Sequence, residues 1–170
     1  MRYAVVDVET TGFSPVHDAV VEVGCAVVDD GRIVATWNSL VNPGRSIPRY
    51  ATLVHGICDQ DVLFAPSLSS IARRLNWLCE GSTVVAHNAS FDSAFLPMLE
   101  RERWMCTVKL ARRAFPDAPN WRLQTLREYL RIPQEARFGD LTPHRALADA
   151  VVTAHVLRRC LDQLKMPVAA

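Results

Sequence analysis

The sequence predicts an α/β fold, a mixed sheet covered by helices, on three observations. Segments of β-type composition come first, and strand-length apolar segments then alternate with segments of helical periodicity. Strands followed by strand–helix units are typical of a mixed sheet flanked by helices. No linker, repeat or low-complexity segment divides the chain, so we expect one domain over 1–170.

The first three elements are predicted to form an antiparallel meander. Tyr3–Val8 alternates in polarity and is β-branched, and two further strands are expected over Ala19–Asp29 and Arg32–Val41. Between the last two lies Asp29-Asp30-Gly31-Arg32, a strong hairpin signal.

Helical periodicity begins after the meander. Pro43 and Pro48 end the meander, and the stretch over 42–66 is expected to contain loops and short helices. Apolar residues at helical spacing predict a helix over Ser67–Glu80, which stops at Gly81, a favourable residue for a C-cap.

The remaining elements alternate. A short buried strand is predicted over Thr83–Ala86, a helix over Ser90–Arg103, a strand and then a helix within Trp104–Phe115, and a helix over Leu123–Leu130.

The last helix is expected to open at Thr142 with Pro143 in its first helical position, a favoured pairing. Its apolar stripe runs from Leu147 to Leu164.

The charge is nearly balanced but unevenly placed. The net charge of +1 and the pI of about 7.7 are too low for a protein that clamps long duplex nucleic acid by charge alone. Residues 1–70 hold four basic and eight acidic side chains, whereas residues 101–137 hold nine basic and four acidic ones. Such asymmetry suits a site that holds cations and receives a polyanion, and a solvated charged surface is the alternative.

Membrane and secreted classes are disfavoured. The N-terminal apolar stretch meets Asp7 and Glu9 too early for a signal peptide, and the most apolar window, Ala19–Val28, is about half the length of a membrane span. The five cysteines form no C-x-x-C pair, which favours reduced thiols in a cytoplasmic protein.

The first strand carries a pair of carboxylates. A period of two places Asp7 and Glu9 on one face and Val6 and Val8 on the other. Adjacent carboxylates favour a hard cation such as Mg²⁺ or Mn²⁺ between them, while a polar outer strand face is the structural alternative.

Two further clusters follow in the chain. Asp92, after His87 and Asn88, falls in the first turn of a helix, where it could bind a cation or merely stabilise the helix dipole. His144 and Asp149 lie five residues apart, which on a regular helix turns their side chains about 140° apart. A His144 in a frayed first turn could still swing toward the site as a general base, and simple capping is the alternative.

Taken together, these three stretches closely resemble the exonuclease motifs of the DEDDh family, and the DnaQ-like branch in particular. The matching stretches are Asp7-x-Glu9-Thr10-Thr11-Gly12, His87-Asn88-x-x-Phe91-Asp92 and His144-Arg145-Ala146-x-x-Asp149. The likeness covers nearly the whole chain and implies a ribonuclease H-like fold with a five-stranded mixed sheet.

The resemblance also implies the site. Asp7, Glu9, Asp92 and Asp149 would hold two divalent metal ions, Mg²⁺ or Mn²⁺, and His144 would be the general base. Ions about 3.5–4 Å apart can stabilise the attacking and leaving oxygens of a phosphodiester.

Five further positions align with family residues that touch or frame the terminal nucleotide: Thr10, Thr11, Phe13, His55 and Asn88. Phe13 would be a wedge against the last base, or else a hydrophobic plug under its turn.

The implied function is a 3′–5′ exonuclease that releases nucleoside 5′-monophosphates, with single-stranded DNA preferred. An RNA- or oligoribonucleotide-trimming exonuclease of the same family is the first alternative, and an inert nucleic-acid-binding module is the second.

The expected partner is nucleic acid with a free 3′ end, DNA before RNA. A DNA polymerase subunit is a second candidate partner. Because the chain ends soon after the last predicted helix, no polymerase-tethering tail is expected, which favours a stand-alone enzyme.

Overall fold

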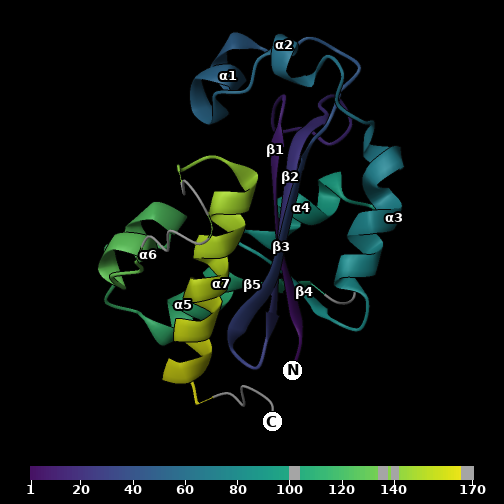
Figure 1. Ribbon diagram of the computed structural model, residues 1–170. Coiled ribbons are helices and arrows are strands. Elements are labelled where there is room, and N and C mark those ends of the chain that lie inside the picture. The colour runs from purple at the N-terminus through teal and green to yellow at the C-terminus, as the bar shows by residue number, and fades with distance from the viewer. Residues whose placement is uncertain (100–103, 134–137, 139–141, 166–170) are drawn as a thin grey trace.

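The computed structural model describes residues 1–99, 104–133, 138 and 142–165. Within these residues, five strands form one sheet in the order β3-β2-β1-β4-β5 (Figure 1). They are β1 (Tyr3–Thr10), β2 (Val20–Asp29), β3 (Arg32–Leu40), β4 (Thr83–Ala86) and β5 (Trp104–Cys106).

The sheet is mixed, as predicted. β2 runs antiparallel to β1 and to β3, whereas β4 runs parallel to both β1 and β5. The predicted ribonuclease H-like architecture, with its three antiparallel N-terminal strands, is therefore confirmed.

Side chains of β1 alternate between the two faces of the sheet. Tyr3 and Val5 pack into one hydrophobic core, beneath the helices over 107–114, 123–129 and 146–163 (α7). Ala4, Val6 and Val8 pack into a second core on the opposite face, beneath the helices over 68–79 and 89–95. Asp7 and Glu9 continue the row of Val5, so they lie on the face that α7 covers.

Helices cover both faces of the sheet (Figure 1). One face carries α3 (Leu68–Cys79) and α4 (Ala89–Phe95). The other carries α5 (Thr107–Ala114), α6 (Leu123–Tyr129) and α7 (Ala146–Gln163). Within the described ranges, no helix is long and apolar enough to cross a membrane.

The expected short helices after the meander are α1 (Arg49–His55) and α2 (Asp59–Val62). They form a cap beyond the C-terminal end of β1 and the N-terminal end of β2 (Figure 1). The cap has its own small core, made by Val21, Ile47, Ala51, Ile57 and Val62.

The helix predicted over Ser90–Arg103 is shorter than expected. α4 ends at Phe95, and Pro97 follows two residues later, a position from which proline cannot continue the helix. Residues 100–103 lie outside the described ones. The apolar stripe survives this change, because Phe91, Phe95 and Leu99 all pack against the same core.

The start of the last helix was predicted three residues too early. Its first helical residue is Ala146 instead of Pro143, and its N-cap is Arg145 instead of Thr142, because His144 has a left-handed φ of 60° and Arg145 is extended. Pro143 therefore precedes the helix, and the first helical N–H group is satisfied by a carboxylate from β2, described below.

Candidate active site

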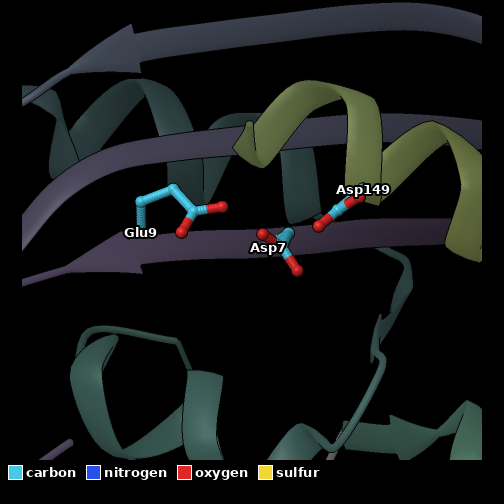
Figure 2. Close-up of side chains that lie close together, drawn as sticks. All are labelled: Asp7, Glu9 and Asp149. Carbon is cyan, nitrogen blue, oxygen red and sulfur yellow. The ribbon is translucent and has the colours of Figure 1, made fainter. Parts of the chain in front are cut away.

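Three carboxylates meet where α7 crosses β1. One ligand oxygen from each of Asp7, Glu9 and Asp149 lies within 4.8 Å of the others. Figure 2 shows Asp149 reaching from α7 toward Asp7, with Glu9 further along the same strand. Asp7 and Glu9 are partly buried and Asp149 is buried. Oxygen ligands at this spacing suit a hard divalent cation.

Asp92 approaches the same place from the other side. It lies in the first turn of α4, is only 3% exposed, and its carboxylate accepts a hydrogen bond from the backbone of Val8 on β1. Its negative charge is the strongest of the neighbouring charges that raise the pKa of Asp7. The fourth predicted acid therefore adjoins the cluster of three.

All four carboxyls have raised pKa values, chiefly because burial disfavours their charged forms. Burial raises the pKa of Glu9 to about 8 and that of Asp92 to about 7. The pKa values of Asp7 and Asp149 are also raised by burial, and the negative charges of the neighbouring acids raise that of Asp7 further. A bound cation would reverse this effect, because it favours the ionised forms.

Asp149 is held by two hydrogen bonds, one on each oxygen. Its Oδ1 accepts from the side-chain Nε2 of Gln124 at 3.1 Å, and its Oδ2 accepts from the backbone N–H of His144 at 3.2 Å. Gln124 belongs to α6, so a second helix orients the carboxylate that α7 supplies.

A partly buried ion pair fixes the start of α7. Glu22 of β2 is 1% exposed, and its carboxylate accepts from Arg145 Nε at 3.0 Å and from Arg145 Nη2 at 2.8 Å. The same carboxylate accepts from the backbone N–H of Ala146 at 2.9 Å. Glu22, from strand β2, thus takes the place of the side chain that usually caps a helix N-terminus. Its negative charge also interacts favourably with the helix dipole.

Gly24 allows α7 to approach the sheet. It pairs with Asp7 in the β1–β2 ladder, and a Cβ atom placed on it would overlap the backbone of Ala146 and Leu147. The absence of a side chain at this one position lets the helix that carries Asp149 lie close to Asp7.

His144 lies at the mouth of the cluster. It is exposed, it precedes α7, and the left-handed backbone at this residue aims its N–H at Asp149. The predicted conflict with helical geometry therefore does not arise, since His144 is outside the helix. Its role as a general base stays a prediction.

The turn after β1 holds three of the residues predicted to frame a nucleotide. Thr10 donates to the carbonyl of Gly12 at 2.6 Å, and buried Thr11 donates to Asp18 at 3.1 Å. Phe13 is 84% exposed, so its interpretation as a plug under the turn is wrong. Its ring meets that of Phe91 edge-on, with the centroids 6.5 Å apart.

The other two framing residues come from the cap and from the start of α4. His55 is buried, its Nδ1 accepts from the N–H of Ile57, and burial lowers its pKa. Among the described residues, its Nε2 has no hydrogen-bond partner. Asn88 is exposed and precedes α4 in a left-handed conformation, with φ of 76°.

Sequence reasoning missed four positioning residues: Glu22, Gly24, Gln124 and Arg145. A usable signal existed for two of them. In the predicted meander, Glu22 interrupts an otherwise apolar strand, and Gly24 follows it at a spacing of two, on the same strand face. Arg145 stands in the third motif, between His144 and Ala146, but no local pattern marks its positioning role or that of Gln124, because their partners are distant in the sequence.

The fold and the acidic cluster together define a class of protein. A mixed five-stranded sheet with an acidic cluster between its first strand and a covering helix is the framework of a metal-dependent 3′–5′ exonuclease. The chain belongs to the RNase T exonuclease family, which matches it over residues 4–157. The predicted DnaQ-like enzyme class is therefore confirmed.

Named relatives place the chain more closely. It is 38% identical to a DNA polymerase III subunit epsilon-like protein of Rhodobacter capsulatus over 97% of the chain. It is 31% identical to the 3′–5′ exonuclease DinG of Bacillus subtilis over 96% of the chain. It covers 24% and 18% of these two proteins, so it spans a quarter or less of their length.

Solved structures agree with this placement. Exonuclease X in complex with 5′ overhanging duplex DNA superposes with a TM-score of 0.85 and 31% identity, over 98% of this chain and 95% of that one. The nuclease domain of 3′hExo, a DEDDh family member bound to rAMP, has the same fold at a TM-score of 0.77 and 17% identity, over 95% and 92% of the two chains.

The close approach at Gly24 is testable by Gly24→Ala. The added methyl group pushes the start of α7 away from β2 and moves Asp149 from Asp7, so Mn²⁺ affinity measured by calorimetry is expected to fall about 10- to 100-fold. Gly44→Ala is the matched control, because its φ of 66° makes alanine unfavourable but its Cβ would contact nothing. Unchanged Mn²⁺ affinity in Gly24→Ala contradicts the assignment.

The raised pKa values predict how stability depends on pH without divalent cations. Between the ordinary carboxyl pKa of about 4 and the folded values of about 7 and 8, the folded state binds more protons than the unfolded chain. The free energy of unfolding in EDTA should therefore fall as the pH rises from about 5 to 8, by several kcal/mol. Urea denaturation at a series of pH values measures it.

Two variants test the origin of this pH dependence of stability. Asp7→Asn should flatten the pH dependence, because it removes one member of the coupled group. Asp117→Asn, at an exposed acid after α5, should leave it unchanged. A wild-type stability that is constant or rises over this pH range would contradict the prediction.

Proposed function

We propose that this chain is a 3′–5′ exonuclease domain over 1–170 that hydrolyses terminal phosphodiester bonds and releases nucleoside 5′-monophosphates. Single-stranded DNA is the proposed substrate. The observation that carries the proposal is the convergence of Asp7, Glu9 and Asp149 within 4.8 Å, with Asp92 beside them, in a chain of the exonuclease family.

The donor set fits a pair of divalent cations, Mg²⁺ or Mn²⁺. Asp7, Glu9, Asp92 and Asp149 offer only carboxylate oxygens, the ligands these ions prefer. When bound, such ions supply charge neutralisation for the attacking and leaving oxygens of a phosphodiester and lower the pKa of water.

The proton transfer is assigned to His144. Its ring is exposed at the mouth of the cluster, while its backbone is tied to Asp149. A side chain placed in this way can take a proton from the attacking water and still exchange it with solvent. Because Glu22 holds the adjacent Arg145, the exposed loop that carries His144 is anchored at its C-terminal end.

The terminal nucleotide is proposed to lie between the turn after β1 and the start of α4. Exposed Phe13 offers an apolar ring that contacts Phe91, the residue before Asp92, and exposed Asn88 directly precedes the same helix. Thr10 and Thr11 shape the turn that presents Phe13, and His55 supports that turn from the cap.

DNA is preferred over RNA because Exonuclease X, which shares 31% identity, is named as a complex with DNA. Because the Rhodobacter capsulatus relative is named a DNA polymerase III subunit epsilon-like protein, a polymerase subunit is a second proposed partner. RNA trimming by this domain is an outcome of the experiment below.

The decisive assay follows mononucleotide release from matched 3′-labelled single-stranded DNA and RNA of one sequence, with Mg²⁺, Mn²⁺ or EDTA. Release from DNA with either cation and none in EDTA is expected. Asp7→Asn should lower the rate at least about 10³-fold, since it removes a charge from the cation site. Asp117→Asn, at an exposed acid, serves as the control.

Each alternative has its own result in this assay. Release from RNA alone would replace DNA with RNA as the substrate. Binding of both polymers without release, with every cation tested, would overturn the enzyme assignment and leave an inert binding module.

The role of His144 is tested by His144→Ala. The variant should lose kcat about 10²- to 10⁴-fold with little change in KM, because proton transfer and not substrate binding is removed. Its pH–rate profile should also lose the limb at which the base becomes protonated. His17→Ala, at an exposed histidine between β1 and β2, should behave like wild type. A wild-type pH profile in His144→Ala would rule out this base.

A further inference from the structure

A groove lies at the β5 edge of the sheet. It has a volume of about 420 Å³ and lies where α4 and α5, which cover opposite faces of the sheet, meet around β5. Its lining residues come from three places: the start of α4, strand β5 and the outer face of α5. Among them are Asn88, Ser90, Ser93, Trp104, Lys109 and Arg112.

One wall of the groove is cationic. Lys109 and Arg112 are three residues apart on α5, so their side chains lie on one helix face with Cβ atoms roughly 5–6 Å apart. Both are exposed, because α5 buries Leu110 and Ala111 instead. Within the described ranges, neither cation forms an ion pair, and no acidic side chain lines the groove.

The other wall offers neutral hydrogen-bonding groups. Ser90 and Ser93 are also three residues apart, on α4. The Ser90 hydroxyl donates to Asn88 Oδ1 at 3.2 Å, and the Ser93 hydroxyl donates to the Ser90 carbonyl at 3.4 Å, so both oxygens remain able to accept. Trp104 and Cys106 of β5 lie between the two walls.

The groove is held rigid by side chains that the proposed chemistry does not use. The ring of His87 bonds through Nδ1 to the Thr107 hydroxyl at 2.8 Å and through Nε2 to the Trp121 carbonyl at 2.9 Å. It thus ties the loop before α4 to the first residue of α5. Arg112 lies over the Trp121 ring at 5.2 Å, which restricts its guanidinium before any ligand binds.

The start of α4 borders both the groove and the site. Asn88 lines it and directly precedes α4, and Asp92 beside the acidic cluster follows four residues later. The strongly acidic pocket repels phosphate unless cations are bound, so a strand that reaches it benefits from a cationic surface alongside.

We propose that this groove binds the phosphate backbone of the substrate strand on the 5′ side of the scissile bond, with Lys109 and Arg112 binding the phosphates. Lys109 acts as a point charge, and Arg112 can bind two phosphate oxygens at once. The inference rests on the proposed exonuclease function and adds to it a subsite for the strand beyond the terminal nucleotide.

The test uses the double variant Lys109→Gln/Arg112→Gln. Binding of a 20-nucleotide single strand in EDTA, followed by fluorescence anisotropy, is expected to weaken about tenfold at 0.1 M salt. The slope of log Kd against log salt should fall by about 1.4, or roughly 0.7 for each phosphate that the protein no longer neutralises. The ratio of cleavage rates on a 20-nucleotide strand and on a dinucleotide should fall about tenfold as well.

Two controls separate this groove from general charge effects. Arg73→Gln/Arg74→Gln removes the same charge from α3, on the other side of the molecule from α5. Arg113→Gln removes one charge from the residue next to Arg112. Arg113 itself does not line the groove. Both should keep the wild-type salt slope and the wild-type ratio of rates.

The outcomes are distinct from those for the function itself. If wild type releases no nucleotide, the exonuclease proposal fails before the variants are compared. If wild type is active and the Lys109/Arg112 double variant keeps the wild-type salt slope and ratio of rates, with melting temperature unchanged, the groove proposal is wrong. A loss of both measures in the Arg73/Arg74 control overturns it as well.

Discussion

The site depends on holding four carboxyl groups together against their own repulsion and against loss of solvent. Burial raises the pKa of each of them, and the negative charges of neighbouring acids raise that of Asp7 further. Such a cluster does not assemble for its own stability, so the surrounding fold must impose it. β1 supplies two of the acids at a spacing of two, and helices from opposite faces of the sheet supply the others.

The second strand is the main support of this arrangement. Glu22 and Gly24 lie opposite Glu9 and Asp7 in the β1–β2 ladder. Glu22 holds the start of α7 through Arg145 and the backbone N–H of Ala146. Gly24 leaves room for the helix to come close to the sheet. Together with the apolar contacts of α7, these two polar and steric constraints fix the height at which Asp149 reaches the cluster.

Much of the fold followed from local patterns, and the errors have physical causes. Strand alternation and the hairpin signal predicted the meander, because both act over neighbouring residues. The start of the last helix was wrong because Pro143 is a good local start signal, whereas a distant carboxylate on β2 sets the true one. The acids were recognised by their motifs, but Gln124 and Arg145 could not be, since only tertiary contacts define their roles.

The pairing of Glu22 with Arg145 limits how much cation charge is needed to neutralise the acidic cluster. This fifth carboxylate is neutralised within the protein by its guanidinium partner, so it adds nothing to the charge that ions must offset. The four others sum to four negative charges when ionised, which one divalent ion halves and a pair cancels. A pocket neutralised by such a pair would admit an anionic ester without net repulsion, and a sixth acid would upset that balance.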